Sequence, residues 1–93
     1  MNRAYAILQR ELIGLEVKVL KSINPHYVGI SGRIIDETKE TVTVLDDRKE
    51  KTLVKRLATF QLTLPDGTVL EVDGKTLVGR IEDRVKGLLR RGW

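Results

Sequence analysis

Short runs of alternating apolar and polar residues, separated by turn sequences, place the strongest constraint on the fold of this 93-residue chain. The clearest run covers residues 59–64, where Phe60, Leu62 and Leu64 would share one face of a strand. It leads into Pro65-Asp66-Gly67, a typical hairpin turn because proline presets the first turn dihedral and glycine accepts positive φ. This pattern predicts a mainly β protein.

Five further segments have the same character, being short, rich in β-branched residues and bounded by turn signals. They comprise residues 15–19, 28–35, 41–44, 51–54 and 68–72. Gly29 and Gly32 interrupt the second of them, and glycine inside a strand marks a bend or a close backbone approach. About six short strands with such bends predict a small antiparallel barrel of the Sm-like or SH3 type, which we place at residues 14–78.

Both ends of the chain change to helical spacing. Residues 1–13 place Ala4, Leu8 and Leu12 at intervals of four, which predicts a short N-terminal helix whose apolar stripe needs a surface to lie on. Residues 79–91 predict a basic amphipathic C-terminal helix. We expect the barrel and the two helices to form a single domain over residues 1–93.

The basic residues are concentrated at one end of the chain. The net charge is +4, and residues 80–93 hold five basic and two acidic residues, while the preceding part is nearly balanced. This distribution indicates either a local contact with a polyanion or a solvated helix face. With few aromatic residues available for base stacking, such a contact would read the backbone and shape of an RNA. The candidate cations are Lys18, Lys21, Arg33, Lys55, Arg56, Arg80, Arg84, Arg90 and Arg91.

Residues suited to catalysis or metal binding are scarce. The chain has no cysteine and only one histidine, His26, so a thiolate zinc site is excluded and a reducing cytoplasm is favoured. Two acidic pairs, Asp36-Glu37 and Asp46-Asp47, are what a small metal-dependent nuclease would need, although both fall in predicted turns. No run approaches the roughly 18 apolar residues of a membrane span, and no secretory signal is expected.

Several motifs occur in an order that resembles archaeal ribonuclease P protein component 1, the counterpart of a subunit shared by eukaryotic nuclear RNase P and RNase MRP. The resemblance covers about residues 11–84. It is carried by Glu11-Leu12-Ile13-Gly14-Leu15, Ser22-x-Asn24-Pro25, Val28-Gly29-Ile30-x-Gly32-Arg33-Ile34-x-Asp36-Glu37-Thr38, Thr59-Phe60 and Leu64-Pro65-Asp66-Gly67.

The resemblance implies an RNA-binding subunit of an endoribonuclease that removes the 5′ leader of precursor tRNA. Catalysis would belong to the RNA and its magnesium, so this chain would be noncatalytic, would bind no cofactor and would support the specificity region of the RNA. The implied partners are RNase P RNA, a zinc-ribbon subunit that contacts Ala4, Leu8 and Leu12, other protein subunits and, indirectly, precursor tRNA. The alternative is a ribosomal or translation-associated SH3-like barrel.

Overall fold

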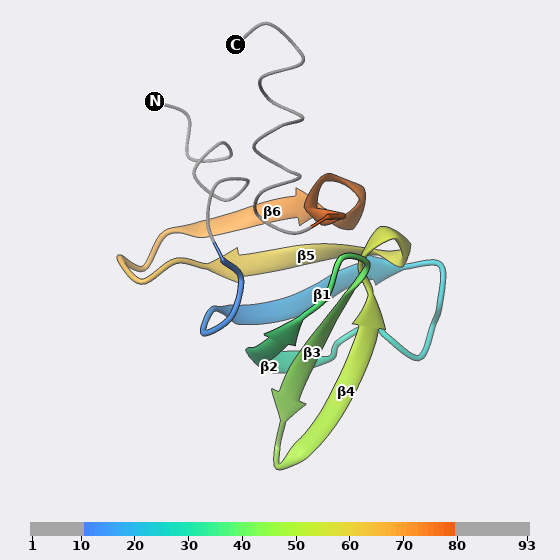
Figure 1. Cartoon of the computed structure of the whole chain (residues 1–93), viewed down its shortest axis with the longest axis horizontal. Coiled ribbons are helices and arrows are strands. Elements are labelled where there is room, and N and C mark those ends of the chain that lie inside the picture. The colour runs from blue at the N-terminus through green and yellow to red at the C-terminus, as the bar shows by residue number, and fades with distance from the viewer. Residues whose placement is uncertain (1–10, 80–93) are drawn as a thin grey trace, which may run out of the picture.

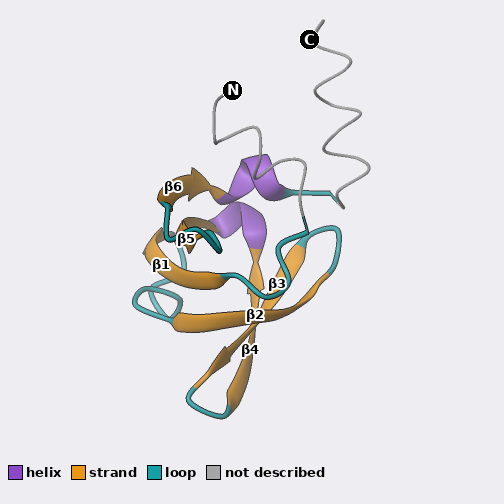
Figure 2. Cartoon of the chain, turned by 90° about the vertical axis from the view of Figure 1, so that its left-hand side faces the viewer, coloured by secondary structure: helices purple, strands orange, loops and turns teal. Residues whose placement is uncertain are grey.

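The computed structural model describes residues 11–79, which form a six-stranded antiparallel sheet with two short 3-10 helices (Figure 1). The strands are β1 (Glu16–Ser22), β2 (Ser31–Glu37), β3 (Thr41–Asp46), β4 (Lys49–Val54), β5 (Ala58–Thr63) and β6 (Val69–Asp73). The 3-10 helices are η1 (Lys55–Leu57) and η2 (Gly74–Leu77), which are coloured purple in Figure 2. The mainly β class and the six predicted strands are therefore confirmed, except that the second strand begins at Ser31 and residues 28 and 29 form a turn.

The strand order in the sheet is β4-β3-β2-β1-β5-β6. Strand β5 follows β4 in the chain but pairs with β1, and η1 makes this crossing. Figure 1 shows the consequence, because β5 and β6 run at a steep angle to β3 and β4. Within residues 11–79 no strand pairing joins β4 to β6. The described sheet is thus open at these two edges, and it does not show the closed barrel predicted from the sequence.

One face of the sheet carries the hydrophobic core. The predicted alternation in β5 is confirmed, since Phe60 and Leu62 are buried while Thr59 and Gln61 are only partly so. Strands β1 and β2 bend over this core at irregularities between Val19 and Lys21 and between Ile34 and Asp36. Such bulges increase the local twist. The buried residues form one cluster that extends from Leu12 to Leu77.

Two hairpin turns have the backbone geometry that their sequences require. Gly67 has φ of 88°, which confirms the turn predicted at Pro65-Asp66-Gly67. Between β3 and β4, Asp47 and Arg48 have φ of 47° and 69°, and positive φ at both central residues of a two-residue turn suits the right-handed twist of the strands. These turns fix the registers of the β3–β4 and β5–β6 pairs.

The predicted terminal helices lie almost entirely outside the described residues. Residues 11–13 of the expected N-terminal helix are not helical, because the chain already turns into β1 here and Leu15 N donates to Leu12 O over 3.1 Å. Of the expected C-terminal helix only Gly79 is described, and it lies in a bend. Among residues 11–79, no helix has the length and apolar character needed to cross a membrane.

Candidate nucleic-acid interface

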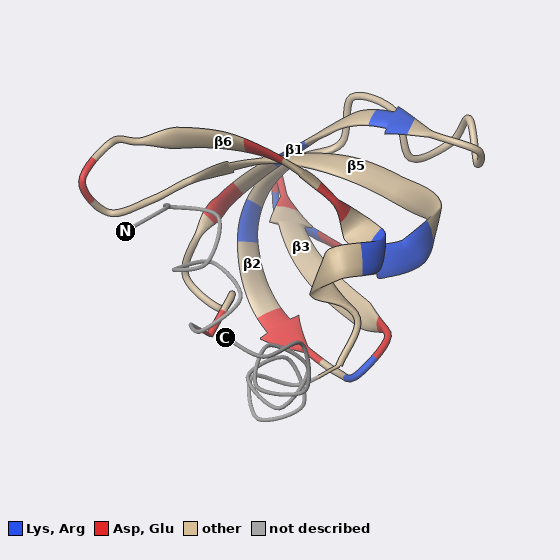
Figure 3. Cartoon of the chain, turned by 90° about the horizontal axis from the view of Figure 1, so that it is seen from above, with Lys and Arg blue, Asp and Glu red and all other residues tan. Residues whose placement is uncertain are grey.

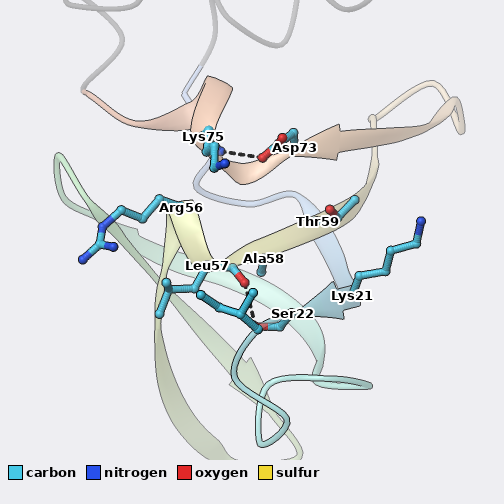
Figure 4. Close-up of a pocket in the computed structure, with 9 residues that line it drawn as sticks. Lys21, Ser22, Arg56, Leu57, Ala58, Thr59, Asp73 and Lys75 are labelled. Atoms are coloured by element: carbon cyan, nitrogen blue, oxygen red, sulfur yellow. Dashed lines mark hydrogen bonds between the residues drawn. The ribbon is translucent and has the colours of Figure 1, made fainter.

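A groove of about 340 Å³ opens at the end of the sheet where β1 finishes and both 3-10 helices lie (Figure 4). Three exposed cations and one carboxylate stand around it. Figure 4 shows Lys21 and Arg56 on opposite sides of the groove and Lys75 above it. The lining residues are Lys21, Ser22, Ile23, Arg56, Leu57, Ala58, Thr59, Asp73 and Lys75.

Strand register builds one wall of the groove. Lys21 of β1 pairs with Thr59 of β5, and Thr59 pairs with Asp73 of β6. Directly paired residues of an antiparallel sheet place their side chains on the same face as neighbours. Because Phe60 points into the core, the adjacent Thr59 points to the opposite face. The three polar side chains therefore form a single row, Lys21–Thr59–Asp73, across three strands.

The two 3-10 helices supply the other cations, Arg56 from η1 and Lys75 from η2. The helices touch closely at Gly74, where an added Cβ would lie only 1.7 Å from the carbonyl oxygen of Lys55. Asp73 caps η2, since its Oδ1 accepts a hydrogen bond from Lys75 N over 3.0 Å. Figure 3 shows the blue, basic parts of both helices side by side. Backbone packing thus brings Arg56 and Lys75 to one end of the sheet.

The groove also has a fixed floor between β1 and η1. Ser22 Oγ donates to the carbonyl of Leu57 over 2.7 Å, and Ile23 N donates to the same carbonyl over 3.2 Å. The Ile23 side chain is left 81% exposed, so it presents an apolar surface beside the cations. These contacts hold the end of β1 against η1 and give the groove a defined shape.

The electrostatic character of the groove is positive. Lys21, Arg56 and Lys75 form no ion pair with any acidic residue of the described chain. Asp73 is the only acidic residue in the lining. Three unpaired, exposed cations around a concave surface attract phosphate groups, because each is available to replace a condensed counterion of the polyanion.

Residues 5–87 match the family model described as ribonuclease P/MRP, subunit p29. The chain belongs to this family. It is 42% identical over 86 residues to ribonuclease P protein component 1 of Methanothermobacter thermautotrophicus, covering 91% of this chain and 92% of the relative. It is 48% identical over 81 residues to the protein of the same name from Thermofilum pendens, covering 86% of each.

A solved structure supports the same assignment. Mth11, a homologue of the human RNase P protein Rpp29, is 42% identical in sequence and superposes with a TM-score of 0.60, covering 81% of this chain and 97% of that chain. The resemblance seen in the sequence motifs is therefore confirmed. Membership of the p29 family does not favour the alternative of a ribosomal SH3-like barrel.

The described p29 sheet brings together only part of the predicted set of cations. Lys21 and Arg56 both line the groove, whereas Lys18 is exposed on β1 outside the lining. Arg33 lies on β2, opposite Glu16 in the register, and its Nη2 is 3.3 Å from Glu16 Oε1. Arg80, Arg84, Arg90 and Arg91 lie outside the described residues.

Lys55 is a correction to the prediction. Its side chain is 0% exposed, and its Nζ donates to Glu37 Oε2 over 2.7 Å and to the carbonyls of Thr38 and Gly79 over 2.8 and 3.2 Å. An ammonium group that is buried among oxygen acceptors is not available to phosphates. We therefore remove Lys55 from the set of RNA-binding candidates.

Leu12 is the second correction. We expected it to face a partner subunit, but it is 0% exposed and belongs to the core of this chain. The reason is that the segment before β1 folds back over the sheet, with Gly14 N donating to Ile34 O over 2.7 Å. Ala4 and Leu8, the other members of the predicted stripe, lie outside the described residues.

Lys75 is the groove cation that sequence reasoning missed. It directly follows Asp73-Gly74, which from the sequence alone indicates only a turn. The usable signal was the capping pattern, because an aspartate two residues before a lysine at the start of a short helix fixes where that lysine lies. Nothing local to residues 73–75 shows that Arg56 is nearby.

The acidic pairs of the nuclease hypothesis do not converge. Glu37 is bound to Lys55, and Asp46 Oδ2 is 3.3 Å from Lys51 Nζ on the neighbouring strand. Asp36 Oδ1 accepts a hydrogen bond from Glu37 N over 2.9 Å, and both residues belong to β2 and not to the predicted turn. Residues 11–79 contain no cluster of three or more acidic or histidine side chains suited to a metal ion. The geometry gives the nuclease hypothesis no support.

Proposed function

We propose that this chain is an RNA-binding protein subunit of archaeal RNase P, and that the groove around Lys21, Arg56 and Lys75 is one of its contacts with the RNA. Membership of the p29 family supports the first part, since the relatives are named as RNase P protein components. The observation that carries the second part is that three unpaired cations, one each from β1, η1 and η2, line one concave surface.

In this proposal the groove acts by neutralising phosphates where two segments of the folded RNA approach each other. Lys21 and Arg56 stand on opposite sides of the groove, so they can contact phosphates that would otherwise repel one another. The binding is then sensitive to salt, because each phosphate contact contributes about 0.7–0.9 to the slope of log affinity against log salt concentration. The protein would thereby stabilise the specificity region of the RNA.

Cleavage of the 5′ leader of precursor tRNA belongs, in this proposal, to the RNA and its bound magnesium. We propose that this chain contributes no catalytic residue and holds no cofactor. In support, Glu37 and Asp46 are used in ion pairs, and Asp36 accepts a hydrogen bond from the backbone of β2. We place the assembled particle in the cytoplasm. Precursor tRNA is contacted only indirectly.

The proposed protein partners are the zinc-ribbon subunit and other RNase P subunits. We assign the zinc-ribbon contact to Ala4 and Leu8, now without Leu12. We also propose that the complete chain has the Sm-like architecture. The bulges in β1 and β2, and the pairing of β5 with β1 after the η1 turn, support a sheet that curls toward closure.

The test compares two triple variants that remove the same charge from different places. The groove variant carries Lys21→Ala, Arg56→Ala and Lys75→Ala. The control carries Lys39→Ala, Arg48→Asn and Lys49→Ala, three exposed cations outside the lining, with asparagine chosen because position 48 has positive φ.

Binding of each full-length variant to RNase P RNA is measured over a range of salt concentrations. We expect the groove variant to bind more weakly and its salt slope to fall by about two units, while the control stays close to the parent protein. Equal losses in the two variants would mean that only total charge matters. A groove variant that binds like the parent would remove the groove from the RNA contact.

A further inference from the structure

The groove contains polar groups that phosphate binding does not need. A site that bound phosphates alone would gain nothing from a carboxylate, yet Asp73 stands among the three cations. Its capping role uses one oxygen, Oδ1, and serine or asparagine would cap the helix equally well without a negative charge. Oδ2 takes part in no hydrogen bond or ion pair with the described residues.

Thr59 is the second such group. It lies between Lys21 and Asp73 in the row across β1, β5 and β6. Its side chain is half-buried, and its hydroxyl has no hydrogen-bond partner among residues 11–79. Ser22, the other hydroxyl in the lining, is engaged with the carbonyl of Leu57 and the backbone N of Asn24. Apart from the three cations, the polar side chains of the lining with free hydrogen-bonding capacity are therefore Thr59 and Asp73.

We propose that the groove recognises the ribose of RNA, with Thr59 Oγ1 and Asp73 Oδ2 binding a 2′-hydroxyl while Lys21, Arg56 and Lys75 bind the flanking phosphates. A ribose 2′-hydroxyl both donates and accepts hydrogen bonds, so it can donate to the Asp73 carboxylate and accept from the Thr59 hydroxyl. Ile23, which is 81% exposed in the same lining, offers an apolar surface to the sugar ring. The inference rests on the proposed function, because it assigns a chemical group to the same groove.

The arrangement explains why a negative charge is tolerated there. A carboxylate near a phosphate is repulsive unless a hydrogen-bond donor of the ligand lies between them, and a 2′-hydroxyl is such a donor. A DNA backbone lacks this group and would leave Asp73 facing phosphates without compensation. The three cations supply affinity for any nucleic acid, and the pair Thr59 and Asp73 supplies the preference for RNA.

The experiment is 2′-deoxy interference mapping on RNase P RNA from the same organism. A pool of RNA in which a small fraction of the 2′-hydroxyls is replaced by hydrogen is bound by the full-length protein, and the bound and free fractions are compared at each nucleotide. For the parent protein we expect at least one nucleotide at which loss of the hydroxyl weakens binding by about fivefold or more, because the hydroxyl makes two hydrogen bonds and one alone accounts for about fivefold. Thr59→Val and Asp73→Asn should each abolish or reduce the interference at that same nucleotide.

Two matched controls carry the same chemical changes elsewhere on the same strands and face. Thr63→Val lies at the other end of β5, and Glu71→Gln lies two positions before Asp73 on β6, and neither residue lines the groove. Both controls should keep the full interference pattern of the parent. Asp73→Asn preserves the cap of η2, so it remains a test even where Thr59→Val disturbs the packing of β5.

The outcomes separate this inference from the proposed function. If the interference pattern is the same in the parent, Thr59→Val and Asp73→Asn, or if the parent shows no interference, the ribose contact is overturned. The groove would still be the RNA contact as long as the triple cation variant weakens binding. If that triple variant binds normally, the proposed interface itself fails. A Thr59→Val protein that binds the RNA more weakly overall but keeps the interference pattern of the parent would also overturn the ribose contact.

Discussion

Lys55 and Glu37 form an ion pair inside the protein, with Nζ 2.7 Å from Oε2 and the two side chains 0% and 7% exposed. The pair connects the two ends of the described chain to the β2–β3 turn. Lys55 Nζ also donates to the carbonyls of Thr38 and Gly79, and Glu37 Oε1 accepts a hydrogen bond from Leu12 N over 3.4 Å. The segments that enter and leave the sheet are therefore held at one point.

Replacing only one member of this pair should be strongly destabilising. Lys55→Met removes the buried cation that lies 2.7 Å from the Glu37 carboxylate and is expected to lower the free energy of unfolding by about 3–5 kcal/mol. The double variant Lys55→Met with Glu37→Leu removes both charges and should recover a large part of this loss. Chemical denaturation of the parent, the two single variants and the double variant measures the coupling. Additive effects would mean that the two groups stabilise the fold independently.

Gly32 is the second position at which the fold depends on one residue. An added Cβ would lie 2.0 Å from the carbonyl oxygen of Leu45 on β3, and this backbone atom cannot move aside without disturbing the pairing of β2 with β3. We expect Gly32→Val to lower the free energy of unfolding by about 3 kcal/mol or more. Thermal melting measures the change. Ser31→Val, an exposed position of the same strand, is the control and should melt near the parent, so equal losses at both positions would contradict the steric argument.

The sheet was predictable because its information is local. Alternation over 59–64 and the Pro65-Asp66-Gly67 turn are properties of adjacent residues, and they fix β5, its buried face and its hairpin with β6. Closure of the sheet into a barrel could not be predicted in this way. It depends on how the β4 and β6 edges lie relative to each other, and no pattern of adjacent residues encodes that arrangement.

The candidate site was only partly predictable for the same reason. Lys55 and Arg56 are adjacent and chemically alike, but Lys55 is buried against acceptors that lie far away in the sequence, among them Glu37 and Gly79, while Arg56 stays exposed. Lys75 lies near Arg56 because η2 packs against η1 at Gly74. This packing is a tertiary contact between segments that are separate in the sequence. The sequence therefore identified basic residues, and the fold decided which of them share a groove.

Gly74 links the stability of the fold to the geometry of the groove. An added Cβ would meet the carbonyl oxygens of Lys55 at 1.7 Å and of Ala58 at 2.6 Å, so Gly74→Ala must push η2 away from η1. We expect a lower melting temperature and weaker RNA binding at temperatures where the variant is still folded, because Arg56 and Lys75 move apart.

The control for Gly74 is Thr76→Ala, a neighbouring exposed position of the same short helix. It removes only a hydrogen bond from Thr76 Oγ1 to the carbonyl of Asp73 and should have a small effect on both quantities. RNA binding is measured on samples shown to be folded by circular dichroism. A Gly74→Ala protein that melts lower but binds RNA with the affinity of the parent would show that the spacing of η1 and η2 does not control the groove.

Arg33 and Arg56 should differ in their contribution to RNA binding, although both are exposed and both belong to the RNA-binding candidates predicted from the sequence. Arg33 is paired with Glu16 at 3.3 Å, whereas Arg56 has no acidic partner in the described chain. Arg56→Ala should therefore reduce the salt slope of RNA binding by somewhat under one unit, about 0.7–0.9, and Arg33→Ala should change it less.

Glu16→Gln is the informative companion, because it frees Arg33 and should strengthen binding slightly if Arg33 is within reach of the RNA. Since an exposed ion pair contributes only about 0–1 kcal/mol, neither change at the Glu16–Arg33 pair should alter the melting temperature much. An Arg33→Ala protein that loses as much affinity and slope as Arg56→Ala would show that the RNA contact extends over β2 and that the groove is only part of it.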